Sequence, residues 1–483
     1  MKISYSLKNS TLKIKSLIKS DDVEFMDFFI GKTRAVLIFL KDMVDKTALG
    51  ELVLRPLAQL SSEISKDTIT ATTLYPEKEF IYTIHQIVDE VVDGNVTLLI
   101  DKKNFAVCFS LKKFPQRSIT EPPTSTVIKG PREGFVESLP VNVSMMRRRI
   151  KSHNLKFENM IIGRYSKTPI CICYVSGIVD KKLVKMLKNK LSLIDTDAIL
   201  DSSYLSKFLG EKKASIFKQV GNTEKPDILS AKILEGRVAI LVDGSPIALT
   251  VPYLLVEDFQ SPSDYYNSSY SATLARFLRL LSVTISIFLP AYYVSAELFH
   301  LQLIPLSFLL TIVNSLKGIP LSPSFEMFFT LLIFEILNEA SVRMPKYVGM
   351  VVSIVGGLVL GETAVTAGII SAPTLMIIAL SGICLYTVPE LEQTFSILRF
   401  VMLIVAGSLG GYGLIVSIVL LLLYLVSFES FGTPVLAPFS PLIAKDLKDG
   451  FIKGFLVEQE LRPYSIPNKN KKRMNTKNIF KEQ

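Results

Sequence analysis

Five ionisable side chains stand inside apolar runs of the C-terminal half, where a charge is costly to bury. Glu335, Glu339 and Arg343 recur every four residues and therefore share one face of a helix. Glu362 and Arg399 occur in two further apolar runs. Ionisable groups in such surroundings either lie along an ion pathway or neutralise one another as structural pairs. These five residues are therefore the first candidates for function.

The two arginines of this set need acidic partners. Glu339 and Arg343 are about one helical turn apart, which favours a neutralising pair. Arg399 has no such neighbour, and Glu390 or Glu392 could reach it only if the chain folded back.

The helix expected over residues 347–370 carries a stripe of small residues beside one carboxylate. Gly357 and Gly361 form a small-xxx-small step, which lets helices approach closely. In a symmetric oligomer Glu362 would repeat as a ring of carboxylates, which favours cations. In a single chain it could instead be protonated and hydrogen-bonded. The pore-lining candidates are Ser353, Gly357, Gly361, Glu362 and Ala364.

Composition divides the chain into a polar and an apolar part. Residues 277–443 contain five Lys or Arg and eight Asp or Glu, whereas 20% of the whole chain is charged and its net charge is +10. So few charges over so long a run indicate a membrane domain. They exclude a freely soluble enzyme, a disordered protein and a disulfide-stapled secreted protein.

The charges outside this region predict its orientation. Basic residues gather in segments that stay cytoplasmic, and residues 1–20 lack the continuous apolar run of a secretory signal. We therefore expect both the N-terminal part and the basic tail in the cytoplasm, which requires four or six spans. The apolar segments are 277–299, 301–316 and 325–337 (a re-entrant pair or two short spans), 347–370, 373–388, and 394–428, which is long enough for two passes broken at Gly407 to Gly413.

The N-terminal part contains an internal duplication. The apolar run 36–40 precedes Val44-Asp45-Lys46 and a helical pattern, and the run 171–175 precedes Val179-Asp180-Lys181 and another. Short runs rich in Val, Ile and Leu indicate strands. The sequence thus predicts an α/β soluble region of two similar subdomains, followed by a polytopic α-helical membrane domain. The expected parts are an N-terminal extension (1–29), subdomain 1 (30–120), a linker (121–131), subdomain 2 (132–262), the membrane domain (263–443) and a basic tail (444–483).

The sequence shows no recognisable catalytic motif. The sequence contains no glycine-rich phosphate loop, nucleophile elbow or paired-histidine motif. Cys171 and Cys173 point the same way from one strand, and we interpret them as buried apolar side chains. No nucleic-acid recognition module is visible. We therefore expect no catalytic residues, no cofactor, no metal and no nucleic acid partner.

A series of motifs resembles the A subunit of the GerA-type spore germinant receptors. The resemblance covers residues 30–455, and the motifs keep their order and spacing. Glu362 departs from it, because Gln is expected there in much of the family, so ion selectivity is not carried over. The matching runs are Gly130-Pro131-Arg132-Glu133-Gly134-Phe135, Glu137, Asn142, Arg147-Arg148-Arg149, Gly163-Arg164, Ser166-Lys167-Thr168, Lys225-Pro226-Asp227, Glu235-Gly236-Arg237-Val238, Asp243-Gly244-Ser245-Pro246, Asp264-Tyr265-Tyr266, Glu335, Glu339-Ala340, Arg343, Pro345, the glycine-rich helix, Gly432, Pro434 and Pro438.

The resemblance implies a location and partners. The location is the inner membrane of a dormant spore, with membrane lipid around the helices. The partners are a transporter-like B subunit that binds the nutrient and a lipoprotein C subunit. The resemblance also implies that A subunits form a homo-oligomer, a pentamer, which acts as a nutrient-gated channel for monovalent cations.

In this reading, nutrient binding to the B subunit shifts a closed–open equilibrium of the A-subunit ring. The contact candidates between subunits or subdomains are Arg132, Glu133, Arg147, Arg148 and Arg149. The alternative is a non-conducting scaffold that couples the B subunit to downstream germination effectors. A secondary transporter would need inverted repeats in the membrane half, whereas the duplication lies in the soluble half.

Overall fold

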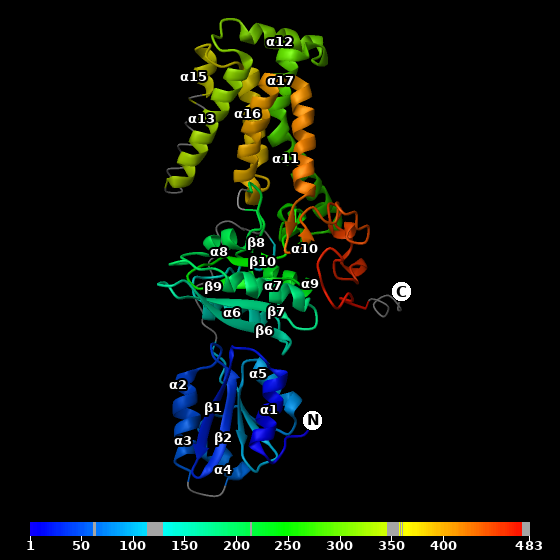
Figure 1. Ribbon diagram of the computed structural model, residues 1–483. Coiled ribbons are helices and arrows are strands. Elements are labelled where there is room, and N and C mark those ends of the chain that lie inside the picture. The colour runs from blue at the N-terminus through cyan, green and yellow to red at the C-terminus, as the bar shows by residue number, and fades with distance from the viewer. Residues whose placement is uncertain are drawn as a thin grey trace.

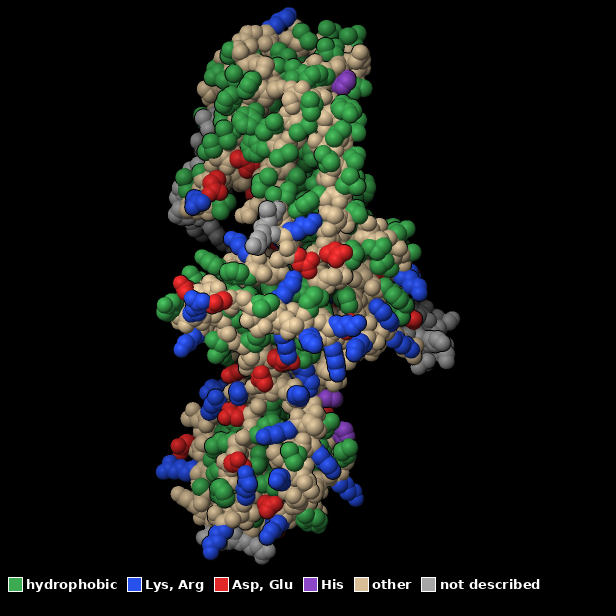
Figure 2. Space-filling model, viewed as in Figure 1, with side chains coloured by type: hydrophobic (Ala, Val, Ile, Leu, Met, Phe, Trp, Pro, Cys, Tyr) green, Lys and Arg blue, Asp and Glu red, His purple; other side chains and the backbone are tan. Residues whose placement is uncertain are grey.

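The chain forms two α/β units, a helical region and a C-terminal segment that returns to the second unit (Figure 1). The computed structural model describes residues 1–60, 64–113, 129–212, 215–344, 357, 359 and 361–475. The N-terminus lies in the first unit, and the C-terminal segment lies beside the second (Figure 1). Figure 2 shows Lys and Arg over both α/β units, whereas the helical region presents an almost uncharged apolar surface.

The first unit is an antiparallel sheet between two layers of helices. The strand order is β1-β2-β4-β5-β3. Helices α1 and α5 cover one face, and α2, η1, α3 and α4 cover the other. The bounds are α1 Leu7–Leu17, β1 Val23–Ile30, β2 Thr33–Leu40, α2 Lys46–Ala48, η1 Leu49–Leu54, α3 Arg55–Ala58, α4 Lys66–Thr72, β3 Lys78–Ile81, α5 Ile84–Val92, β4 Val96–Ile100 and β5 Ala106–Phe109.

Burial on both faces explains the continuous apolar run in β2. Ile38 packs against Ile14 and Val91 on one face, whereas its neighbour Leu37 packs against Leu57 on the other. Successive side chains of a strand point to opposite faces, so a strand covered on both sides needs apolar residues throughout.

The second unit repeats the first, as the duplication predicts. Its strand order, β6-β7-β9-β10-β8, matches strand for strand. Helices α6 and α9 cover one face, and α7 and α8 cover the other. Cys171 and Cys173 are buried together beneath α6 and α9. The bounds are α6 Leu139–Arg149, β6 Leu155–Ile162, β7 Thr168–Val175, α7 Lys181–Ser192, α8 Ser202–Leu209, β8 Gly221–Thr223, α9 Pro226–Glu235, β9 Val238–Val242 and β10 Ala248–Val251.

The residues expected to form an N-terminal extension contain α1 and β1. Strand β1 pairs with β2 along its whole length, from Val23 opposite Leu40 to Ile30 opposite Thr33. Ile14 of α1 is fully buried beneath the sheet. Helix α1 therefore occupies in the first unit the place that α6 occupies in the second. Most of the expected linker lies outside the described residues.

The helical region begins and ends beside the second unit. Helices α11, α13 and α16 run along its long axis, and α12 lies at the end distant from the α/β units (Figure 1). The bounds are α11 Ser269–Phe299, α12 Leu306–Leu316, α13 Pro323–Arg343, α15 Gly361–Thr366, α16 Ala372–Leu385 and α17 Glu392–Val426. Helix α13 has 21 residues and is about 31 Å long, so it exceeds the short segment expected over 325–337.

Helix α17 is a hairpin of two arms, 392–409 and 411–426, as the glycine cluster predicts. Gly410 is non-helical, with φ 64° and ψ −152°. A Cβ on Gly413 would lie 2.9 Å from Cγ1 of Val405, which a straight helix forbids. Thr394 in the first arm donates to the carbonyl oxygen of Ile216 at 2.6 Å, and Tyr424 in the second arm bonds Ser215 at 3.1 Å. Both ends of the hairpin therefore face the second α/β unit.

Among the described residues, two helical stretches are long and apolar enough to cross a membrane, Ser269–Phe299 and Pro389–Val426, and the second contains both arms of α17. Leu306–Leu316 and Ala372–Leu385 are shorter apolar helices. These elements lie in the region that composition marks as a membrane domain.

Candidate functional site

Arg399 is the centre of a polar network inside the helical region. Its side chain is fully buried, and Nη2 pairs with the carboxylate of Glu335 on α13. Nη1 donates to Oγ of Ser381 on α16 at 3.0 Å, and that hydroxyl donates to the carbonyl oxygen of Ser286 on α11 at 2.8 Å. One arginine therefore ties three helices to the first arm of α17.

The acidic residues that the sequence suggested as partners of Arg399 have other contacts. Glu390 pairs with Lys218 of the second α/β unit at 2.8 Å. Glu392 accepts a hydrogen bond from Nδ2 of Asn338 at 2.8 Å. The chain does not need to fold back, because Glu335 reaches Arg399 from α13.

Glu339 and Arg343 form the ion pair that their spacing favours. The nearest nitrogen and oxygen are 2.5 Å apart, but the two side chains are 64% and 78% exposed. An exposed pair contributes little stability. Glu335 and Glu339 therefore share a helix face but differ in environment.

The small-residue stripe is only partly described. Glu362 lies on α15 with its side chain exposed, and Ala364 is half-buried. Gly361 is buried, and a Cβ there would lie 3.1 Å from the side chain of Leu375. Gly357 is exposed, with nothing within 4 Å of a Cβ, and Ser353 lies outside the described residues.

The end of this helix differs from the expectation. Helix α15 ends at Thr366, whereas the sequence predicted helix to residue 370. Gly368 has φ 68°, a left-handed conformation that ends helices and suits glycine.

The basic triplet divides between two contacts. Arg147 is buried against the first α/β unit, with its Nε 2.8 Å from Oδ2 of Asp22. Arg148 and Arg149 both pair with Glu133 inside the second unit. Arg132 is exposed. Arg147 therefore forms a contact between the subdomains, as does the ion pair of Lys151 with Asp93.

Sequence reasoning missed an ionic joint at the base of α11. Asp264, on α10 (Ser263–Tyr266), accepts from Nε of Arg276 at 3.1 Å and from Nη1 of Arg279 at 2.7 Å. Arg276 also donates to the carbonyl oxygen of Gly450 at 2.6 Å. The sequence feature that could have indicated this contact is the presence of two arginines, three residues apart, near the start of an apolar helix. This joint connects the helical region to the C-terminal segment.

A second buried cluster lies within the second unit, around Glu257, which follows β10. Glu257 pairs with Arg237 and, at 2.6 Å, with Lys232. Its carboxylate also accepts from the backbone N–H of Leu254 at 2.8 Å. Burial raises the pKa of Glu257, but the two cations outweigh burial and lower that pKa to about 2.

Acidification should therefore destabilise the second unit through this cluster. A carboxylate whose pKa is lowered on folding stabilises the folded state at pH values above its ordinary pKa, which is 4.5 for Glu257. This contribution is lost as the pH falls toward the lowered pKa of about 2. We expect Glu257 to contribute on the order of 3 kcal/mol at neutral pH. Between pH 6 and pH 3, the unfolding temperature should fall more steeply for the unaltered chain than for Glu257→Gln. Equal slopes would contradict the assignment.

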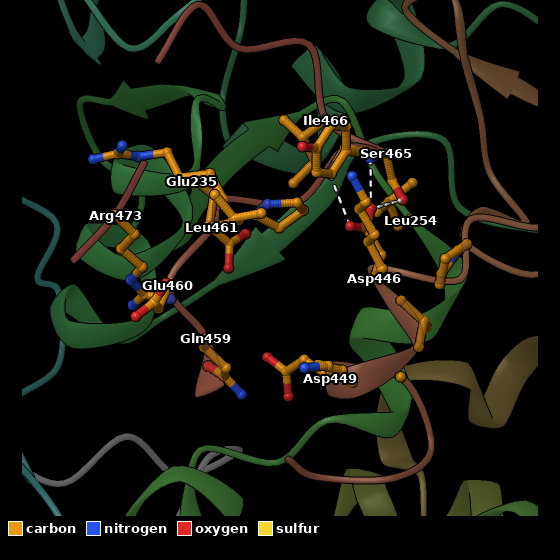
Figure 3. A pocket seen from close by; sticks show the side chains of 18 of the residues that line it. Glu235, Leu254, Asp446, Asp449, Gln459, Glu460, Leu461, Ser465, Ile466 and Arg473 are labelled. Carbon is orange, nitrogen blue, oxygen red and sulfur yellow. Dashed lines mark hydrogen bonds between the residues drawn. The ribbon is translucent and has the colours of Figure 1, made fainter. Parts of the chain in front are cut away.

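A cavity of about 640 Å³ lies between the second unit and the C-terminal segment (Figure 3). Asp446 accepts from Oγ of Ser465 at 2.5 Å within it, and Asp449 pairs with Arg276 at 3.1 Å. Ile466, also in its wall, is fully buried. Asp446 and Asp449, two acidic residues of the cavity wall, thus form contacts that hold the C-terminal segment in place.

These contacts connect the parts of the chain with one another. Within the described residues, no group of three or more His, Cys, Asp or Glu could hold a metal ion. Buried ion pairs connect the two α/β units, α11 with α10 and the C-terminal segment, and α13 with α17.

Comparisons with known proteins find similar sequences along most of the chain. The sequence model of the Bacillus/Clostridium GerA spore germination protein family matches residues 11–465. Spore germination protein KA of Bacillus subtilis (strain 168) is 36% identical over 485 residues, covering 98% of this chain and 88% of that protein. Spore germination protein GerLA of Bacillus cereus is 34% identical over 429 residues, covering 87% of each.

A solved structure is also similar in sequence. It is the N-terminal domain of the A subunit of the Bacillus megaterium spore germinant receptor GerK3, with 26% identity and a TM-score of 0.41, covering 53% of this chain and 98% of that chain. Family membership rests on the matches that run through both halves of the chain. The chain therefore belongs to the Bacillus/Clostridium GerA spore germination protein family.

Proposed function

We propose that this chain is the A subunit of a nutrient germinant receptor in the spore inner membrane. In this proposal, several copies, as a pentamer, form a ring that opens as a channel for monovalent cations. A transporter-like B subunit binds the nutrient, and a lipoprotein C subunit completes the receptor. The family assignment and the names of the relatives support the germination role.

The observation that carries the channel proposal is the exposure of Glu362. It is a carboxylate on a short helix in an otherwise apolar region, and its side chain is not buried within the chain. The exposed Gly357 and Val359 precede it. Exposed small and apolar residues beside a charge fit a helix that faces other copies around a water-filled path.

The orientation proposal has its own support. Helix α11 starts beside the second α/β unit, and the second arm of α17 ends beside it (Figure 1). Lys and Arg are frequent on that side, which the positive-inside rule assigns to the cytoplasm. We therefore place both α/β units and the C-terminal segment in the cytoplasm.

Flux through reconstituted receptors tests the channel. Liposomes containing this chain with its B and C partners should release potassium or sodium when the nutrient is added. Glu362→Gln should lower the flux roughly two- to tenfold, because each subunit would lose one charge that concentrates cations at the path. Glu339→Gln is the matched control, since Glu339 is exposed on α13 and its partner Arg343 is exposed too.

Each outcome decides between assignments. Unchanged conductance and selectivity in Glu362→Gln would remove this residue from the path. Absence of flux from a folded complex that binds nutrient would favour the scaffold, in which the chain transmits the signal without conducting.

A further inference from the structure

Two buried carboxylates and a tyrosine converge at the end of the helical region that is distant from the α/β units. Glu297 lies near the end of α11, and Glu326 lies near the start of α13. Tyr293 is one turn before Glu297 on α11. Figure 1 shows the end of α11 and the starts of α13 and α16 at this same end of the region. Tyr293 packs in one apolar cluster with Met327, which follows Glu326, and with Ile377 of α16.

Each of these groups presents an oxygen without a partner. The exposed fractions are 8% for Glu297, 1% for Glu326 and 6% for Tyr293. Within the described part of the chain, Oε1 of Glu297, Oε2 of Glu326 and Oη of Tyr293 are buried and have no hydrogen-bond partner. Neither carboxylate forms an ion pair with a described residue. Buried polar groups are normally satisfied, so three orphaned oxygens together indicate a missing ligand.

The charge of the missing ligand follows from the contacts of Glu326. Its Oε1 accepts from both the backbone N–H and Oγ of Ser371, each at 2.7 Å. Ser371 is the N-cap of α16, and the positive end of that helix dipole faces the carboxylate. These donors compensate Glu326, whereas the described part of the chain offers Glu297 only the neutral hydroxyl of Tyr293. One uncompensated negative charge therefore remains, which one monovalent cation would neutralise.

The neighbouring backbone is also suited to an ion. Helix α17 is broken at Gly410, and a Cβ on Gly407 would lie 2.8 Å from Oγ of Ser324, another buried and unpartnered oxygen. Broken helices next to buried carboxylates are a common setting for alkali-metal ions in membrane proteins. His300, which follows the last residue of α11, lies against Gly411.

We propose that each chain binds one monovalent alkali-metal cation between Glu297, Glu326 and Tyr293. The ligands are Oε1 of Glu297, Oε2 of Glu326 and Oη of Tyr293, all hard oxygen donors. The site lies within one chain, so it depends neither on the ring nor on conduction. A bound cation holds α11, α13 and the start of α16 together at their distant end.

Cation-dependent thermal stability of the purified full chain in detergent tests the site. At constant ionic strength and pH, replacing choline chloride by NaCl or KCl should raise the unfolding temperature by about 3–6 °C and then saturate. Glu297→Gln and Glu326→Gln should abolish the dependence on the cation. Tyr293→Phe, a milder change, should raise the half-saturating concentration about tenfold while the chain stays folded. Glu339→Gln, on the same helix as Glu326 but exposed, should retain the dependence.

Three results would overturn the proposal. One is the same unfolding temperature in choline, sodium and potassium. Another is a larger shift with CaCl₂ than with either alkali-metal salt, because a divalent ion contradicts the charge balance. The third is a dependence on pH alone that Glu297→Gln removes, since the two carboxylates would then share a proton instead of a metal ion.

Discussion

Replacing Arg147 by alanine should lower the free energy of unfolding by about 3–5 kcal/mol, because it leaves a buried carboxylate without its cation. The side chains of Arg147 and Asp22 are 1% and 7% exposed. The pair is bidentate, with Nε 2.8 Å from Oδ2 and Nη2 3.1 Å from Oδ1. The guanidinium also donates to the carbonyl oxygen of Ser152 at 3.0 Å and lies 5.0 Å from the ring centroid of Phe157.

The same change should loosen the two α/β units from each other. Asp22 belongs to the first unit and precedes β1, whereas Arg147 lies on α6 of the second. Further contacts accompany the pair, and two of them are made by Asp21. The backbone N–H of Asp21 donates to the carbonyl oxygen of Phe157 at 2.9 Å, and Oδ2 of Asp21 accepts from the backbone N–H of Asn159 at 2.8 Å. Proteolysis between the units should therefore become faster in Arg147→Ala.

Arg148→Ala is the matched control for this prediction. Its side chain is 38% exposed, and Glu133 keeps Arg149 as a partner. We expect a loss below about 1 kcal/mol. Circular dichroism during urea unfolding measures both variants, since the chain contains no tryptophan for fluorescence. A cycle that adds Asp22→Asn separates the pair from other losses. Similar losses in the two arginine variants would refute a special role for Arg147.

The sequence predicts elements with a strong local pattern and misses those that depend on partners. The duplicated strands appear as apolar runs because both faces of each sheet are covered. Helix α1 does not appear as an apolar run. It is rich in Lys, and its buried residues, among them Leu7 and Ile14, are separated by polar positions. The hairpin of α17 was predictable because glycine is tolerated at the positive φ of Gly410.

The charged sites show the same division. The pair of Glu339 and Arg343 follows from spacing, because neighbours on one helix meet wherever the helix packs. The pair of Glu335 and Arg399 joins residues 64 positions apart, so only the packing of α13 against α17 brings them together. Arg276 and Asp264 are 12 positions apart but on different helices. No local pattern specifies such contacts.

Replacing Arg399 by glutamine should be the most damaging single change in the helical region. It leaves Glu335, which is 20% exposed, without its cation and removes the donor that reaches Ser381. Loss of one member of a buried pair costs about 3–5 kcal/mol. Thermal unfolding of the purified chain in detergent measures this loss. Arg343→Gln is the matched control, because Arg343 is 78% exposed and its loss should cost less than about 1 kcal/mol.

A double variant separates the stabilising role of this pair from a role in signalling. Arg399→Met with Glu335→Leu removes both charges, and an apolar replacement of a buried pair is often close to neutral. We therefore expect the double variant to regain most of the stability that Arg399→Gln loses. If nutrient-dependent flux also returns, the pair only holds the helices together. If the folded double variant conducts no ions, the change of state requires the charges themselves, and the contact between α13 and α17 is an element that switches. Failure of the double variant to regain stability would show that Arg399 is held by more than Glu335.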